Sequence, residues 1–329
     1  MIEKGISTII PNYNGRLLLE VILPPLIVSL TNSGLKFEVI VVDDCSSDDS
    51  ISFLEQDFER IKIIKNRVNK GFSYSMNKGI NASQFSLLFF LNSDVIVTPA
   101  YFETQLPYFE KPDTFGVMGR MIGWEDDHIQ DGGKYPYFEL AKIKTSGNYI
   151  PADSAAGQKL YSMYLSGANA LVSRQKVLLL NGFDEIYSPF YVEDYDLSLR
   201  AWRLDWKCYY DHFAVCRHKI SVSIKSAASK KHVAKIYNRN KMILHAIHLH
   251  GVQKVFWFMQ LLLEAIFRTI TFQWYYTRAL WLFGNNAKNI ENSKKAFEAV
   301  SFKQGKNNSV REVVTFIRTS LATKNISRF

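Results

Sequence analysis

Three carboxylates fall within four positions of the stretch FYVEDYDLSLRAW (190–202): Glu193, Asp194 and Asp196. Two kinds of chemistry suit this spacing. Acidic side chains in the first turn of a helix accept hydrogen bonds from free N–H groups and complement the helix dipole. The alternative is a catalytic role for one or more of these carboxylates. The segment by itself leaves both interpretations open.

Four apolar runs in the first hundred residues predict the layer that would position such a site. The runs are 7–10, 37–42, 61–64 and 85–91, and helical patterns separate them. Runs that are apolar at nearly every position are typical of parallel strands covered on both faces, and the alternation predicts a doubly wound α/β fold. The segment between the first two runs predicts a helix interrupted by Pro24 and Pro25.

Polar side chains follow three of these runs directly. In a doubly wound layer, ligands bind beyond the carboxyl ends of the strands. An acid after the second run could hold a ribose hydroxyl or a base N–H, and Asp94 could hold a divalent cation. Each position alone is better explained as a turn or cap residue, whereas their joint occurrence favours a ligand site. The residues are Asn12, Asn14, Asp43, Asp44, Asn92 and Asp94.

Other motifs exclude two nucleotide-binding classes and add one candidate ligand. No G-x-G-x-x-G follows the first run and no G-x-x-x-x-G-K-[ST] occurs, so neither a dinucleotide fold nor a P-loop is indicated. A single histidine is usually structural, but His218 closes a strand-like segment after the acid cluster and is a candidate metal ligand.

Charge is distributed unevenly along the 329 residues. From Arg217 onward there are 20 Lys and Arg against 4 Asp and Glu, a net charge of +16, which leaves 20 against 27 before it, a net of −7. The acidic body and the basic tail are therefore expected to have different tasks. Three scattered cysteines and the lack of a signal-peptide pattern predict a cytoplasmic location.

An ordered set of motifs resembles family 2 of the glycosyltransferases, inverting enzymes with the GT-A fold, over roughly residues 5–222. QDGG (130–133) and RNK (239–241) resemble its rhamnosyltransferase-type branch. The motifs are PNYN (11–14), VVDDxSxD (41–48), NxGFxxxxNxG (69–79), LNSD (91–94), GFDE (182–185), EDYDLSLR (193–200) and His218.

The resemblance implies a role for each matching residue. Asp43 would face the base of a nucleoside diphosphate sugar, and Asp94 with His218 would bind Mg²⁺ or Mn²⁺. Asp194 would be the general base, Glu193 would orient the acceptor or raise the proton affinity of its neighbour, and Asp196 is assigned mostly to capping. The remaining nucleotide-site residues would be Pro11, Asn12, Tyr13, Asn14, Asn69, Gly71, Asn77, Asn92 and Ser93.

One departure concerns the metal. The first acid of the family's D-x-D signature is Asn92 in this chain. An amide oxygen coordinates a cation more weakly than a carboxylate does. The substitution is therefore expected to lower the affinity for the metal and to weaken the dependence of the enzyme on it.

The basic tail contains a very apolar segment, 252–283. Charges interrupt it, so no uncharged run approaches the roughly 20 residues that span a bilayer. Three interpretations remain: packing on the catalytic domain or on a second subunit in a homo-oligomer, attachment to an anionic membrane surface, or binding of nucleic acid, which no recognised motif supports. Residues Glu264, Arg268, Thr271, Tyr275 and Arg278 predict a polar stripe along one helix.

These observations predict two regions, a GT-A catalytic domain (1–222) and a basic, aromatic-rich helical region (223–329). The predicted protein is a cytoplasmic glycosyltransferase, peripheral at the inner face of the cell membrane. It would move a sugar onto a saccharide or lipid-linked saccharide in cell-surface polysaccharide synthesis. The alternatives are a sugar-nucleotide nucleotidyltransferase and a non-enzymatic membrane or nucleic-acid binding module.

Overall fold

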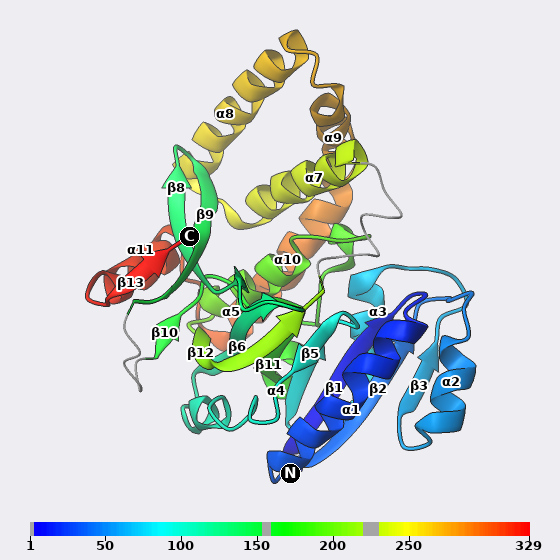
Figure 1. The fold of residues 1–329 in the computed structure, drawn as a ribbon. Coiled ribbons are helices and arrows are strands. Elements are labelled where there is room, and N and C mark those ends of the chain that lie inside the picture. The colour runs from blue at the N-terminus through cyan, green and yellow to red at the C-terminus, as the bar shows by residue number, and fades with distance from the viewer. Residues whose placement is uncertain (1–2, 153–158, 220–229) are drawn as a thin grey trace.

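The computed structural model describes residues 3–152, 159–219 and 230–329 (Figure 1). A mixed ten-stranded sheet forms its centre, in the order β10-β12-β6-β11-β4-β1-β2-β3, with β5 paired to β12 and β7 to β6. The predicted boundary between residues 222 and 223 lies outside the described residues.

The predicted parallel strands are all present. They are β1 (Gly5–Asn12), β2 (Lys36–Asp43), β3 (Lys62–Lys65) and β4 (Leu87–Leu91). Strand β1 pairs in parallel with β2 and with β4, and Asn12 lies opposite Asp43 at the end of the ladder. The carboxyl ends of these strands therefore meet at one edge of the sheet, as the sequence predicted.

Beyond β4 the sheet is mixed. Its further strands are β5 (Val95–Val97), β6 (Thr114–Gly123), β7 (Ile129–Asp131), β10 (Leu160–Tyr161), β11 (Asn169–Ser173) and β12 (Lys207–His218). Strand β11 runs antiparallel between β4 and β6. Because β12 pairs with β5 so that His218 faces Val95, the last residue of β12 lies beside Asp94.

Helices cover both faces of this sheet. They are α1 (Arg16–Asn32), α2 (Ser50–Asp57), α3 (Phe72–Ala82), α4 (Arg174–Leu179) and α5 (Glu193–Arg203), with 3₁₀ turns η1 (Leu106–Glu110) and η2 (Glu185–Tyr187). Hydrophobic clusters fill the space on the two faces.

Helix α1 does not break at its two prolines, contrary to the sequence prediction. Pro24 and Pro25 remove the donors that would pair with the carbonyls of Glu20 and Val21. Both of those residues are exposed, so water can reach that side of the helix. The opposite face, with Leu19, Ile22, Leu23 and Leu26, is completely buried and fixes the helix on the sheet.

The C-terminal region is largely helical (Figure 1). It contains α7 (Lys230–His248), α8 (Gly251–Ile270), α9 (Trp274–Gly284), α10 (Ala287–Gln304) and α11 (Val310–Ala322). A second sheet joins β13 (Ile326–Arg328) to the hairpin of β8 (Gly133–Glu139) and β9 (Lys142–Pro151). Residues of α5, α7, α10 and α11 share one hydrophobic cluster, so this region packs on the body.

The polar stripe predicted for one helix is divided between two. Helix α8 ends at Ile270 and α9 begins at Trp274, so the chain turns within the predicted stripe. Phe272 in this turn has a φ of 57°, a left-handed conformation that an α-helix cannot contain. Figure 1 shows α8 and α9 at the edge of the molecule, away from β1–β3.

Candidate active site

A cavity of about 500 Å³ opens at the carboxyl ends of β1, β2 and β4 and extends to the start of α5. It brings together segments separated by almost two hundred residues. Predicted residues that line it are Pro11, Asn12, Tyr13, Asn69, Gly71, Asn92, Ser93, Asp94, Glu193 and Asp194.

The lining differs from the prediction at the acidic pair that follows β2. Asp44 lines the cavity, whereas Asp43 does not. The carboxylate of Asp43 is buried and accepts hydrogen bonds from Asn12 Nδ2 (2.9 Å) and from the backbone N–H of Ser46 (3.0 Å). Asp43 therefore fixes the loops after β1 and β2. Strand alternation does not distinguish the two in sequence, because β2 ends at Asp43 and Asp44 already lies in the loop.

Two predicted nucleotide-site residues have structural contacts instead. The Asn77 side chain bonds both backbone groups of Phe183, donating to the carbonyl at 2.8 Å and accepting from the N–H at 2.9 Å. It joins α3 to the segment before α5 and lines a different cavity. The side chain of Asn14 accepts from the N–H of Ser47 at 2.7 Å and closes a loop beside the cavity.

Gly71 is required by its backbone conformation and by its neighbours. Its φ is +85°, and a Cβ added there would lie 2.9 Å from the carbonyl oxygen of Pro189. Its N–H donates to Asp44 Oδ2 at 2.7 Å, and the N–H of Lys70 donates to Oδ1 at 2.9 Å. Asp44 thus holds the 69–71 loop at the end of β2, and the missing side chain of Gly71 lets this loop approach Pro189.

Asp94 and His218 converge at the rim of the cavity, as the sequence predicted. His218 Nε2 lies 3.6 Å from Asp94 Oδ2, and His218 Nδ1 lies 2.7 Å from Gln130 Oε1. Because the amide oxygen of Gln130 can only accept, Nδ1 carries a proton, and Nε2 is the ring nitrogen that faces Asp94. An imidazole nitrogen beside a carboxylate oxygen is a pair of donor atoms that a divalent cation can bind.

The oxygen atoms around this pair fit a divalent cation. Asp94 Oδ1 and Asn92 Oδ1 are buried and have no hydrogen-bond partner within the described part of the chain. Oxygen donors of this kind suit Mg²⁺ or Mn²⁺. Across residues 3–152, 159–219 and 230–329, no group of three or more His, Cys, Asp or Glu side chains is arranged around a metal position. A cation held by Asp94 and His218 would therefore need further ligands, such as Asn92 Oδ1, water or oxygen atoms of a bound molecule.

Two adjacent residues with positive φ immediately precede α5 and orient its first two acidic side chains. Tyr191 has a φ of 73° and Val192 a φ of 80°, which is unfavourable for a β-branched residue. No side chain caps this helix end. The strained backbone therefore positions side chains. It directs Glu193 and Asp194 toward the cavity, which both of them line.

Both of these acids have raised pKa values. Burial raises the pKa of Asp194, although its carboxylate accepts from the N–H of Tyr195 at 2.7 Å. Burial, and next the charge of Asp194, raise the pKa of Glu193 well above its usual range. Glu193 Oε2 is buried without a hydrogen-bond partner in the described residues. A carboxylate of raised proton affinity at a cavity wall is suited to accept a proton.

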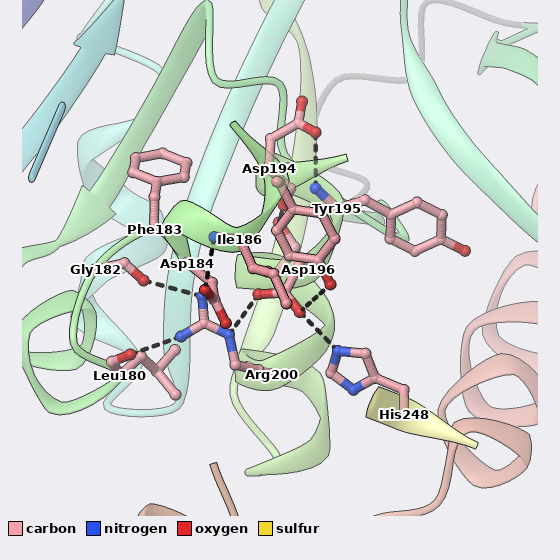
Figure 2. Close-up of polar contacts among 12 residues, drawn as sticks. Leu180, Gly182, Phe183, Asp184, Ile186, Asp194, Tyr195, Asp196, Arg200 and His248 are labelled. Carbon is pink, nitrogen blue, oxygen red and sulfur yellow. Dashed lines mark hydrogen bonds and ion pairs between the residues drawn. The ribbon is translucent and has the colours of Figure 1, made fainter. Parts of the chain in front are cut away.

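Asp196 is not a helix cap, which corrects the sequence assignment. It is 1% exposed and accepts from Arg200 Nε at 2.7 Å, His248 Nε2 at 2.8 Å and the Tyr187 hydroxyl at 3.0 Å. Figure 2 shows its side chain within this network, while Asp194 points away from it.

The electrostatics of this network depend mainly on Arg200. Burial alone would raise the pKa of Asp196, but the charge of Arg200 and the hydrogen bonds lower it to about 2. Burial lowers the pKa of His248, so this imidazole is neutral and contributes a hydrogen bond rather than a charge. Asp196 therefore ties α5 to α7.

Helix α7 also clamps the strained segment before α5, which the sequence did not predict. Asn240 is fully buried, and its Nδ2 lies near three carbonyl oxygens: Tyr187 at 2.6 Å, Phe190 at 3.0 Å and Tyr191 at 2.8 Å. Arg239 donates to the carbonyl of Ser188 at 2.5 Å. In the sequence, only the short RNK motif pointed to these residues, and it implied no role for either of them.

Comparisons with known proteins identify the family and the fold. The model of the family "Glycosyl transferase family 2" matches residues 7–175. An uncharacterized glycosyltransferase of Haemophilus influenzae is 32% identical over 121 residues, which is 36% of each chain. A second one is 36% identical over 108 residues, so the chain covers about a third of the length of these two relatives.

Solved structures share the fold at low sequence identity. The crystal structure of GalNAc-T7 with UDP, GalNAc and Mn²⁺ aligns with a TM-score of 0.68 at 12% identity, covering 98% of this chain and 58% of that one. S. aureus TarS 1–349 in complex with UDP aligns with a TM-score of 0.53 at 16% identity, covering 92% of each chain. The predicted GT-A-type α/β fold is thereby confirmed.

Proposed function

Because this chain belongs to glycosyl transferase family 2, we propose that it moves a sugar from a nucleoside diphosphate donor to a saccharide or lipid-linked saccharide. We infer that transfer inverts the anomeric carbon. One observation carries the proposal: the same cavity holds Asp94, with a buried oxygen that lacks a partner among the described residues, and Asp194, with a raised pKa.

The donor half of the cavity would hold the nucleotide. Pro11, Tyr13 and Asp44 would contact the nucleoside, and Asn69 and Gly71 would border the diphosphate. Glycine at 71 lets the backbone approach closely. Asp94 and His218 would hold Mg²⁺ or Mn²⁺, with Asn92 as a weaker oxygen ligand. A bound cation would neutralise charge on the leaving diphosphate.

The acceptor half would perform the proton transfer. The acceptor hydroxyl oxygen forms a bond to the anomeric carbon while the bond from that carbon to the diphosphate oxygen breaks on the opposite face. Asp194 takes the hydroxyl proton. Glu193, kept protonated by its buried position, would donate a hydrogen bond to the acceptor or to Asp194. Asn240 and Arg239 are positioning residues that hold the segment preceding both acids.

Metal-assisted nucleotide binding tests the donor half. Calorimetry with UDP and GDP, each with Mn²⁺, with Mg²⁺ and with EDTA, should show binding that requires the metal. Asp94→Asn should weaken that binding, while Asp43→Asn should mainly lower stability. The matched control is Asp49→Asn, an exposed acid at the start of α2. Metal-independent binding that Asp94→Asn does not affect would contradict this assignment.

The surface of α8 supports attachment to a membrane. Every exposed residue of this helix from 255 to 270 is apolar except Thr269. The polar residues Gln260, Glu264 and Arg268 instead face the body of the protein, where Glu264 pairs with Lys142. A surface helix of a globular protein normally turns its apolar face toward the core and its polar face toward solvent. The outward apolar residues are Val255, Phe256, Phe258, Met259, Leu262, Leu263, Ile266, Phe267 and Ile270.

Charge favours a bilayer as the occupant of this face. The region from Arg217 onward carries a net charge of +16, which attracts anionic lipid. Exposed Trp274 and Trp281 on the neighbouring α9 suit the interface between headgroups and acyl chains. No helix in the described part of the chain is long and apolar enough to cross a bilayer. Helix α8 would therefore lie in the plane of the interface.

Vesicle flotation tests this attachment. Leu263→Glu and Phe267→Glu alter side chains that are 68% and 64% exposed, so the fold should persist while binding to vesicles with anionic lipid is lost. Leu17→Glu, at a 74% exposed position on α1, is the matched control. Flotation unchanged by the α8 variants would exclude this surface. A dimer that the α8 variants dissociate, without any flotation of the parent, would assign the face to a second copy.

A further inference from the structure

A second cavity, of about 340 Å³, lies under the inner face of α8. The β8–β9 hairpin, α7 and α9 form its other walls, and it shares no residue with the active-site cavity. Figure 1 shows α8 beside the β8–β9 hairpin, with α7 and α9 completing the group. The cavity therefore lies directly beneath α8, the helix proposed to contact the membrane surface.

Positive charge predominates in its lining. Four cationic side chains face two carboxylates there. Lys142 pairs with Glu264, and Lys144 pairs with Glu139. His245 adds no charge, because burial lowers its pKa to about 3 and both ring nitrogens have backbone partners. The remaining cations, Lys241 and Arg268, form no ion pair with any acid among the described residues.

Lys241 is the unusual member of this set. Its ammonium lies 4.4 Å from the centre of the Tyr195 ring and donates no hydrogen bond to a described residue. Burial, and next the charge of Lys144, lower its pKa to about 7. A lysine held in this way is stabilised by any anion that enters the cavity. Arg268 also lines the cavity; its guanidinium lies over the ring of Tyr276 and donates through Nη1 to Gln273 Oε1 at 2.7 Å.

Tyrosines connect this cavity to the reacting end of the active site. Tyr237 lines the second cavity and contacts Tyr191, which lines the first, with ring centres 6.2 Å apart. Tyr195, beneath Lys241, directly follows Asp194. Asp194 lies close enough to Lys241 for its charge to oppose the lowering of the lysine pKa, so the two groups are neighbours across these tyrosines.

We propose that this cavity binds the phosphate or diphosphate group of the acceptor, with Lys241 and Arg268 as its charged contacts. The inference rests on the proposed glycosyl transfer and deepens it, because it names the acceptor class. An acceptor anchored in lipid carries its phosphate at the headgroup level. That is the level at which α8, with its apolar face outward, would hold the cavity.

Calorimetry with three probes in EDTA tests the site without metal-dependent binding at Asp94. Inorganic diphosphate represents a free anion, geranyl diphosphate a lipid-linked one, and geraniol the uncharged tail. Both anions should bind the full-length parent protein and geraniol should not. Tighter binding of geranyl diphosphate would assign a lipid-linked acceptor, whereas equal affinities would assign a water-soluble phosphate-bearing acceptor.

Variants connect the binding to the cavity. Lys241→Met preserves the packing on Tyr195 and should weaken diphosphate binding about tenfold or more, as expected for loss of a charge-assisted hydrogen bond. Lys241→Arg should largely restore it, and Arg268→Gln should weaken it independently. Lys231→Ala, an exposed lysine on the same helix, removes equal charge and should have little effect.

The outcomes separate this inference from the proposed function. Nucleoside diphosphate binding with Mn²⁺, measured on the same preparations, should be unchanged in Lys241→Met, which also shows that the variant folds. Absence of that binding in the parent would defeat the proposed function. If it is present, and diphosphate in EDTA does not bind or binds equally well to Lys241→Met, only the acceptor-phosphate site is overturned.

Discussion

Asp196→Asn should destabilise the fold strongly, although it lies only two residues from the proposed base. The substitution leaves the Arg200 guanidinium, which is buried, without its carboxylate. Breaking a buried pair from one side typically costs about 3–5 kcal/mol. The pKa of Asp196 offers a second measure, because lowering it from 3.8 to about 2 corresponds to roughly 2 kcal/mol. We therefore expect a loss of about 2–5 kcal/mol at neutral pH.

Denaturant unfolding at several pH values is the appropriate assay. A carboxylate whose pKa is lowered by folding stabilises the protein above its unfolded pKa, and this contribution is lost as the pH falls. The parent should therefore lose stability between about pH 4 and pH 2, and Asp196→Asn should lack that part of the loss. Asp194→Asn is the matched control. Because folding raises the pKa of Asp194, removing its charge should leave stability unchanged or increased.

A small effect of Asp196→Asn would contradict this role of the buried network. If Asp196→Asn costs less than about 1 kcal/mol, no greater than an ordinary cap substitution, the network around Arg200 and His248 does not hold α5 to α7.

Three further predictions concern the site. Asn240→Ala should lower the transfer rate more than it weakens nucleotide binding, because it frees three carbonyls of the segment before the acids; kcat and nucleotide affinity, measured separately, decide this. Gly71→Ala should reduce nucleotide affinity and stability, since its Cβ would meet the carbonyl of Pro189 at 2.9 Å in a left-handed conformation; calorimetry and thermal unfolding report both effects. The transfer rate should rise with pH through a range above the usual pKa of an aspartate, because the raised pKa of Asp194 must be passed before it can accept a proton; a pH–rate profile that is already flat at pH 5 would contradict this.

The sequence predicted the catalytic layer well because its signals are local. Apolar runs of strand length locate β1 to β4, and parallel pairing then requires their polar ends to meet. The same logic placed Asp94 and Asn92 at the cavity. It also selected His218 at the end of a strand-like segment, and the pairing of β12 with β5 brings that residue to Asp94.

What the sequence could not resolve depends on contacts between distant segments. The choice between Asp43 and Asp44 depends on which face of the loop meets Asn12. The role of Asp196 depends on His248, fifty-two residues later, and nothing in the spacing of the acids indicates that partner. The role of Asn240 was likewise not predictable from the RNK motif, because this side chain acts on backbone carbonyls that carry no sequence signature. Helix α8 showed its apolar content in sequence, but only the packing shows that its apolar face points outward.

The central claim is that Asp194 removes the proton from the acceptor hydroxyl. Single-turnover transfer under saturating donor, compared between the parent and Asp194→Asn, tests it most directly. Asparagine preserves shape and cannot take a proton, so the rate should fall by about 10²–10⁴ while metal-assisted nucleotide binding stays unchanged. An Asp194→Asn enzyme that transfers sugar at the parental rate would show that the base lies elsewhere.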